Sequence, residues 1–421
     1  MSPHTSPPSG FHGLGIAPSL LQVLDQLKFI TPTPIQTKAI PIAISGKDII
    51  GIAQTGTGKT LAFGLPLIQR LAQTRKQGLV VLPTRELAIQ VDEVLAKVGR
   101  SLGLRTAVII GGASQKMQLQ ALARKPHVII ATPGRLNDHL EQKHLTLSNV
   151  GIVVFDEADR MLDMGFLPQI KRILHALPAE RQTMLFSATM PSAIMQLAAQ
   201  HMKLPTAVEI APSGTTSDRV VQEVFIVQRE QKTALLQKML ERYLGPTLVF
   251  TRTKYGAKKV TRQVRSFGVS AAELHSNRSL GQRREALDGF KSGKYRVLVA
   301  TDIASRGIDV VGIELVVNYD LPSASDDYVH RIGRTARASA NGQAITFALP
   351  NERKELRDIE RLIRKNLPIS QLPQLPATPP PKFFDEERPA RQHHRQFGQR
   401  PQSGGRQRHH QSGGRHGRRF R

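Results

Sequence analysis

One segment constrains the fold of this chain more than any other: Ala53–Thr60, which reads Ala-Gln-Thr-Gly-Thr-Gly-Lys-Thr. It follows the apolar run Ile49–Ile52 and precedes Leu61–Phe63, so the order is a strand, a glycine-rich loop and a helix. In such a loop the backbone N–H groups can surround phosphate oxygens, and the helix N-terminus favours the same anion. Lys59 can reach the β- and γ-phosphates, and the hydroxyl of Thr60 can bind Mg²⁺. Glycine-rich turns also arise from turn geometry alone, so the rest of the chain has to decide the function.

The composition limits the classes of protein. With 421 residues and an apolar fraction of 40%, the chain can build two or three folding units with buried cores. No apolar stretch has the length of a membrane span, and Met1–Gly10 lacks the apolar core of a signal peptide. There is no cysteine, which excludes disulfides and thiolate metal sites. We therefore expect a cytoplasmic protein without membrane association.

The charge is strongly positive and unevenly distributed. The net charge is +26, and residues 388–421 contain ten Arg and no Lys, Asp or Glu. A basic excess of this kind favours a polyanionic partner, and nucleic acid is the usual one. From Leu372 onward the chain is rich in Pro and then in Arg, Gln, His and Gly, which predicts a disordered tail.

Short apolar runs followed by polar clusters predict parallel sheets. The runs are Leu79–Leu82, Val128–Ala131, Ile152–Phe155 and Met184–Phe186, and further along Thr247–Phe250, Val297–Ala300 and Leu315–Val317. Strands buried on both faces have this composition, and ligands bind beyond their carboxyl ends. Helical segments such as Glu86–Val98 and Gln169–Leu177 alternate with the runs. The predicted fold is α/β with two tandem units, of which only the first has a phosphate loop.

The expected organisation has five parts. These are a disordered N-terminus (1–10), a nucleotide-binding unit (11–210), a linker (211–219), a second α/β unit (220–368) and a disordered basic tail (369–421). The linker is small, polar and turn-prone.

Asp156-Glu157-Ala158-Asp159 follows an apolar run downstream of the phosphate loop. A strand-end Asp can hold Mg²⁺ in phosphate-loop enzymes, and a neighbouring carboxylate can orient the attacking water. With this motif the chain resembles the DEAD-box RNA helicases from Phe11 to about Pro368. The other matching motifs are Phe29–Gln36, Pro83–Ala88, Gly111-Gly112, Thr132–Arg135, Ser187–Thr189, Leu248–Thr253, Ala300–Asp309 and His330–Arg337. Within the family, the tail and Ser292–Lys294 are most similar to the bacterial RhlE type.

The resemblance implies two tandem RecA-like domains and an RNA-stimulated ATPase. Such an enzyme hydrolyses ATP to separate short RNA duplexes and to remodel RNA or ribonucleoprotein structures. ATP and Mg²⁺ are the implied cofactors. RNA is the implied partner, bound through its backbone with little sequence preference. RNA-decay or ribosome-assembly proteins are further candidate partners.

The resemblance also implies roles for single residues. Nucleotide binding is implied for Phe11, Gln36, Thr55, Gly56, Thr57, Gly58, Lys59, Thr60 and Asp309, with Thr60 and Asp156 at Mg²⁺. Hydrolysis is implied for Lys59, Asp156, Glu157 and the arginine fingers Arg334 and Arg337. Contact with the RNA backbone is implied for Arg85, Gly112, Thr132, Arg135, Arg283 and Thr301, and coupling of nucleotide to RNA for Ser187 and Thr189. Because the arginine fingers belong to the second unit, hydrolysis would depend on closure of the two units.

The chain departs from the family pattern at three positions. Lys28 stands where the family usually has Gly, and we expect a minor effect. Leu280 replaces a Gln, so a polar network near the RNA groove is missing there. Ala336 replaces a Gly and, in a helical segment, stabilises it by about 1 kcal/mol.

Two other functions remain open at this point. A DNA translocase of the wider helicase superfamily would show ATPase stimulation by DNA. An RNA chaperone or scaffold would bind RNA mainly through its tail and would not need the catalytic set. His330 is as compatible with an orienting role as with a chemical one, since a general base requires suitable geometry first.

Overall fold

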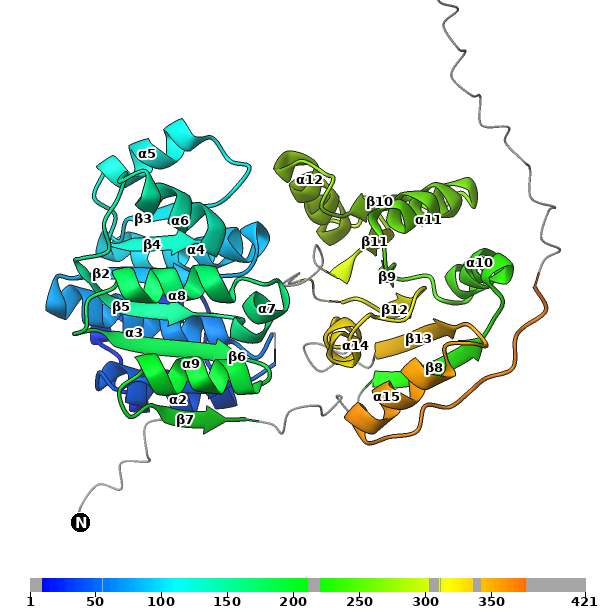
Figure 1. The fold of residues 1–421 in the computed structure, drawn as a ribbon, viewed down its shortest axis with the longest axis horizontal. Coiled ribbons are helices and arrows are strands. Elements are labelled where there is room, and N and C mark those ends of the chain that lie inside the picture. Colours follow the sequence, from blue (N-terminus) through cyan, green and yellow to red (C-terminus); the bar gives the residue numbers. More distant parts are fainter. Residues whose placement is uncertain are drawn as a thin grey trace, which may run out of the picture. The chain divides into compact units, whose positions relative to one another are not determined.

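The computed structural model describes residues 10–54, 56–210, 220–302, 310, 312–335 and 342–375. Thr55, Asp309, Ala336 and Arg337 lie outside these ranges, as do the predicted linker and the basic tail. In the described ranges the chain forms two parallel β-sheets with flanking helices (Figure 1). The predicted α/β class with two sheets is therefore confirmed. No helix in these ranges is both long and apolar enough to cross a membrane.

The first sheet has seven parallel strands in the order β3-β4-β2-β5-β6-β1-β7. The strands are β1 (Ile49–Ile52), β2 (Gln77–Val81), β3 (Thr106–Ile109), β4 (Val128–Ala131), β5 (Val150–Phe155), β6 (Gln182–Ser187) and β7 (Thr206–Glu209). Its helices are η1 (Gly10–Gly13), α1 (Pro18–Gln26), α2 (Pro34–Ile44), α3 (Lys59–Thr74), α4 (Arg85–Gly99), η2 (Arg100–Leu102), α5 (Gln115–Ala123), α6 (Pro133–Glu141), α7 (Ala158–Asp163), α8 (Leu167–Ala176) and α9 (Ser192–His201).

Two apolar clusters cover the two faces of this sheet. Residues of α1 to α4 build one cluster, and residues of α6 to α9 build the other. Successive strand residues point to opposite faces, so Val154 lies in the first cluster and Val153 in the second. The central strands are apolar along their length for this reason.

The second sheet has six parallel strands in the order β10-β11-β9-β12-β13-β8. The strands are β8 (Val220–Ile226), β9 (Thr247–Phe250), β10 (Ala271–Leu274), β11 (Val297–Ala300), β12 (Leu315–Asn318) and β13 (Gly342–Ala348). Its helices are η3 (Arg229–Gln231), α10 (Lys232–Arg242), α11 (Lys254–Ser266), α12 (Leu280–Lys291), α14 (Ser325–Ile332) and α15 (Arg353–Ile363).

Parallel pairing brings three motifs of the first sheet to one edge. In β6, Ser187 is paired with Ile52 of β1, and Leu185 with Phe155 of β5. The phosphate loop, the Asp-Glu-Ala-Asp segment and the Ser187 segment therefore all follow adjacent strand ends, where open α/β sheets bind ligands.

Candidate functional site

The phosphate loop needs glycine at two positions. Gly56 and Gly58 have φ values of 87° and 90°, a region that favours glycine. A Cβ on Gly58 would also lie 2.4 Å from Gln36 Nε2. Thr57 donates its hydroxyl hydrogen to the Gln54 carbonyl over 2.7 Å and closes the turn in front of α3.

Gln36 connects the loop to α2. Its Oε1 accepts a hydrogen bond from Thr33 N over 2.9 Å, and its Nε2 donates to the Gly58 carbonyl over 3.0 Å. The side chain is buried. Phe11, in η1, is buried in the apolar cluster that α1 to α4 build. Gln36 therefore positions the phosphate loop directly.

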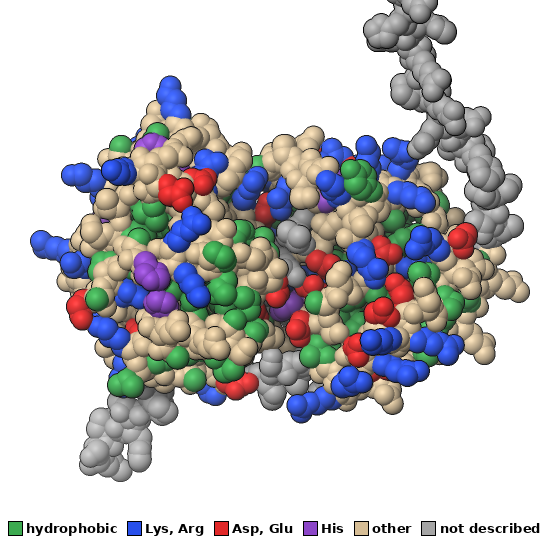
Figure 2. All heavy atoms as spheres, in the orientation of Figure 1, with side chains coloured by type: hydrophobic (Ala, Val, Ile, Leu, Met, Phe, Trp, Pro, Cys, Tyr) green, Lys and Arg blue, Asp and Glu red, His purple; other side chains and the backbone are tan. Residues whose placement is uncertain are grey.

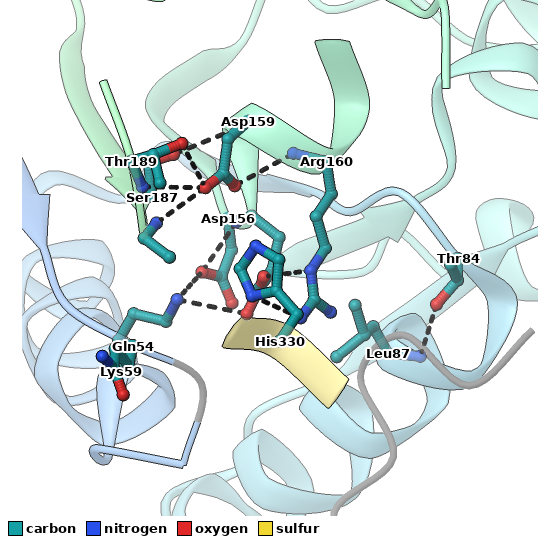
Figure 3. Close-up of polar contacts among 12 residues, drawn as sticks. Gln54, Lys59, Thr84, Leu87, Asp156, Asp159, Arg160, Ser187, Thr189 and His330 are labelled. Atoms are coloured by element: carbon teal, nitrogen blue, oxygen red, sulfur yellow. Dashed lines mark hydrogen bonds and ion pairs between the residues drawn. The ribbon is translucent and has the colours of Figure 1, made fainter. Parts of the chain in front are cut away.

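Lys59 belongs to a buried charge cluster that also includes Asp156 and Arg160 (Figure 3). Its Nζ is 3.1 Å from Glu157 Oε1 and 3.9 Å from Asp156 Oδ1. Arg160 approaches the same glutamate from the other side, with Nε 3.0 Å from Glu157 Oε2. Each Glu157 oxygen thus faces one cation.

Burial and charge together set the protonation of this cluster. Burial favours neutral Lys59, but the attraction of Glu157, Asp156 and Asp159 outweighs it and raises the pKa of Lys59. Burial alone would raise the pKa of Glu157, whereas Arg160, Lys59 and His330 lower it overall. For Asp156 burial dominates over Lys59 and raises its pKa to about 6. Lys59 and Glu157 are therefore ionised at neutral pH, and Asp156 is the least compensated carboxylate.

Asp159 joins the acidic segment to the segment after β6. Its backbone N–H donates to Ser187 Oγ over 3.1 Å. Its Oδ2 accepts from Ala188 N and from both the backbone N–H and the hydroxyl of Thr189, at 2.8–3.1 Å. The structure brings the predicted coupling residues Ser187 and Thr189 together through Asp159 (Figure 3).

Four predicted RNA contacts follow β2, β3 and β4, which are adjacent in the first sheet. Arg85 begins α4 and lies over the Gly111-Gly112 turn, where a Cβ on Gly112 would be 2.2 Å from Arg85 Nη1. Thr132 is the N-cap residue of α6. Arg135, in the first turn of that helix, has its Nε 3.3 Å from Asp138 Oδ2.

Arg283, Thr301 and Arg334 belong to the helices and loops around the second sheet. Arg283 lies in α12 with Nη2 2.9 Å from Glu86 Oε2. Thr301 follows β11, and its N–H donates to the Leu274 carbonyl over 3.2 Å. Arg334 follows α14 and is buried, with Nε donating to the His330 carbonyl over 3.2 Å.

Sequence reasoning gave no role to Asp159, Arg160 or Arg331. Arg331 is buried and binds Asp302 through Nε at 2.5 Å and Nη2 at 2.7 Å, so it ties α14 to the end of β11. Arg160 also lies near this helix, with Nη2 3.5 Å from His330 Nδ1. The sequence spacing of Glu157 and Arg160 could have indicated their contact, since residues three apart share a helix face.

Comparisons with known proteins agree with this arrangement. Residues 33–197 match the DEAD/DEAH box helicase family, and residues 231–339 match the helicase conserved C-terminal domain. The chain is 43% identical to the ATP-dependent rRNA helicase RRP3 of Debaryomyces hansenii, over 86% of this chain and 77% of that protein. It is also 43% identical to the DEAD-box ATP-dependent RNA helicase CshA of Bacillus cereus, over 87% of this chain and 70% of that protein.

Solved structures are similar over most of the chain. The structure of S. cerevisiae Dbp5 bound to RNA and ADP BeF3 has a TM-score of 0.79 and 31% identity, covering 86% of this chain and 96% of that one. Mss116 bound to ssRNA and UDP-BeF has a TM-score of 0.79 and 25% identity, covering 87% and 81%. The chain belongs to the DEAD-box family of ATP-dependent RNA helicases.

Proposed function

We propose that Lys59, Asp156 and Glu157 form the centre that hydrolyses ATP. The observation that carries this proposal is the buried contact of Lys59 with Glu157, made beside a glycine loop at the ends of β1 and β5, the two strands that flank β6. Phosphoryl transfer depends on positioning and charge neutralisation, and this arrangement supplies both.

Lys59 would exchange Glu157 Oε1 for the β- and γ-phosphate oxygens of bound ATP. Glu157 Oε1 would then be available to orient the attacking water, while Arg160 still holds Oε2. Arg334, together with Arg337, would neutralise the charge that develops on the γ-phosphate. The lowered pKa of Glu157 suits a residue that orients water more than one that removes a proton early.

The residues present fit Mg²⁺. The described residues hold no group of three or more His, Asp or Glu that could ligate a metal alone. Mg²⁺ in nucleotide sites is usually held by one or two protein groups together with phosphates and waters. Thr60 in the first turn of α3 and the buried, poorly compensated Asp156 would hold it, and the ion would neutralise phosphate charge.

Gln36 and Phe11 would bind the base. The Gln36 amide uses one hydrogen and one lone pair inside the protein, which leaves one of each for adenine. Thr55, Gly56, Thr57 and Gly58 would surround the phosphates, and Asp309 would bind the ribose.

The RNA backbone would contact six residues: Arg85, Gly112, Thr132, Arg135, Arg283 and Thr301. Ser187 and Thr189 would transmit nucleotide state to them through Asp159. Short duplexes would be the substrate, and ribosomal RNA is a reasonable class because one relative is described as an rRNA helicase. The bacterial RhlE-like subtype rests on the basic tail and on Ser292–Lys294.

The organisation proposed for the chain is a helicase ATP-binding domain at 11–210 and a helicase C-terminal domain at 220–368. A cytoplasmic location and protein partners from RNA decay or ribosome assembly complete the proposal.

Glu157→Gln tests this assignment. ATP affinity should stay within a few-fold, because Lys59 and the loop hold the nucleotide, whereas RNA-stimulated turnover should stop. The exposed Glu141→Gln is the matched control. Loss of ATP binding in proportion to turnover would contradict the role given to Glu157, and stimulation by DNA as strong as by RNA would contradict the substrate class.

A further inference from the structure

Helix α11 carries an unusual charge distribution. Five of its 13 residues are Lys or Arg, and none is acidic. Lys258, Lys259, Arg262 and Arg265 are exposed, while the opposite side of the helix packs into the core. Lys and Arg gather over α11 at the upper edge of the right-hand part of Figure 2. Within the described ranges, no carboxylate forms an ion pair with Lys258, Lys259 or Arg262.

Helix α15 shows the ordinary alternative in the same part of the chain. It exposes four cations, Arg353, Lys354, Arg357 and Arg361, but intersperses them with acidic residues. Arg361 Nη1 lies 3.4 Å from Asp358 Oδ1. Such mixed charge serves solubility, whereas an unbalanced cationic face attracts polyanions.

The basic face of α11 is continuous with the proposed RNA contacts. The helix starts at Lys254, and Thr251–Thr253 separate it from the carboxyl end of β9. Lys254 Nζ donates to Asn277 Oδ1 over 3.1 Å, in the loop that leads to Arg283. The pKa of His275 is lowered first by burial and then by the charges of Arg283, Lys254 and Lys258. All three cations therefore lie near His275. From there the helix extends roughly 20 Å, at 1.5 Å per residue.

An aromatic side chain lies among these cations. Tyr255 is 73% exposed, and Lys254 Nζ lies 5.3 Å from the centroid of its ring. Surfaces for single-stranded nucleic acid combine a cationic track with aromatic rings on which bases stack. This combination favours RNA over an acidic protein as the occupant.

We infer that the α11 face, formed by Tyr255, Lys258, Lys259, Arg262 and Arg265, is an additional RNA-binding surface. It binds the single strand beyond the part that the residues around Arg283 contact. The inference rests on the proposed function, in which the RNA backbone contacts the residues around Arg283. The α11 face would lengthen that binding site.

The test compares two triple variants of the full-length chain. Lys258→Gln/Lys259→Gln/Arg262→Gln removes three charges from α11, and Lys354→Gln/Arg357→Gln/Arg361→Gln removes three from α15. Thermal unfolding verifies that both variants fold. Affinity is then measured at several salt concentrations for two oligouridylates: one just long enough to saturate the RNA-stimulated ATPase, and one several-fold longer.

The α11 variant should lose affinity for the long RNA only. Each phosphate contact contributes about 0.7 to the slope of log K against log salt, so the slope should fall by about 1–2, which lowers the affinity by about 10- to 100-fold at ~0.1 M salt relative to 1 M salt. The α15 variant should keep the slope. Tyr255→Ser should weaken binding of the long RNA by about 5-fold or more without changing the slope, because it removes stacking and no charge.

Three results would overturn the inference: equal losses for the α11 and α15 variants, an equal loss on the short RNA, or unchanged binding of the long RNA. The last would leave an acidic protein as the occupant of the face. These outcomes are separate from failure of the proposed function, which would appear as an absence of RNA-stimulated ATPase in the unmodified chain.

Discussion

Arg160 and Glu157 form an ion pair that is almost fully removed from water. Arg160 Nε lies 3.0 Å from Glu157 Oε2, and the side chains are 0% and 2% exposed. Breaking such a pair from one side leaves an uncompensated buried charge, which commonly costs about 3–5 kcal/mol. Arg160 therefore fixes one oxygen of Glu157, while the other oxygen faces Lys59.

Arg160→Lys should lower the RNA-stimulated kcat by about 10- to 100-fold, because a small misplacement of a reacting group has effects of this size. Lys keeps the charge, so folding should survive, but it lacks the rigid fork of Arg. The dissociation constant for ATP should change little. Arg172→Lys, in an exposed pair with Glu141, is the control. Equal losses of kcat and ATP affinity would show that Arg160 supports only the local structure.

Asp156→Asn should stabilise the nucleotide-free protein at pH 8 more than at pH 5. Burial raises the pKa of Asp156 from its ordinary value of 3.8 to about 6. Between about pH 4 and 6 the folded state therefore binds the proton more tightly than the unfolded state, so stability falls as pH rises through this window. An Asn side chain carries no charge, so its burial does not destabilise the folded state in this way as the pH rises. Urea midpoints at the two pH values give the difference, and an equal shift at both would contradict the raised pKa.

Lys28→Gly should raise the urea midpoint slightly. Lys28 follows the C-cap of α1 with φ 61°, and Phe29 N donates to the Leu24 carbonyl over 2.9 Å. Glycine is preferred at such a position, and relief of the left-handed conformation, about 1–2 kcal/mol, exceeds the extra entropy of unfolded glycine, about 0.4–1 kcal/mol. Lys28→Ala should bring no gain, since alanine keeps the strain. Equal midpoints for Gly and Ala would exclude this explanation.

The sequence predicted those strands whose apolar runs are continuous. β2, β4, β5, β9 and β11 lie within about two residues of their expected positions. β10 was not predicted because Glu273 interrupts it, and in the structure this carboxylate is buried beside His275 and Arg278. Alternating patterns such as β8 were also missed, because one of its faces is partly exposed.

The candidate site was predictable where a residue type has only one chemical use. Gly58 and Lys59 belong to that class. The role of Arg160 was not predictable. An Arg that follows three carboxylates in the sequence is usually a solvated residue at a helix end, and only the fold shows that Arg160 is buried. The sequence also could not show that Asp159 joins two strand ends, since that depends on the pairing of β6.

Arg334→Ala should reduce RNA-stimulated turnover far more than ATP affinity. An arginine that neutralises the transition state contributes about 10³–10⁵ in rate. The control is the exposed Arg361→Ala. Normal stimulated turnover of Arg334→Ala would contradict the proposed closure of two domains on ATP.

Removal of residues 382–421 should weaken RNA binding and make it less dependent on salt. The segment contains ten Arg, and each phosphate contact contributes about 0.7 to the slope of log K against log salt, so the slope can fall by at most about 7. A basic segment without an apolar core engages only part of its charges at once, so we expect a fall of about 2–4. The kcat at saturating RNA should remain, because every motif residue precedes the segment.

A full-length variant with these ten Arg changed to Gln separates charge from chain length. It should behave like the truncated protein in affinity and slope. Both should unwind duplexes less efficiently at low RNA concentration, because a tethered second site raises the local concentration of RNA. If the Gln variant instead keeps the affinity and slope of the unmodified chain, the tail does not bind RNA through its charge, and a protein partner becomes its better explanation.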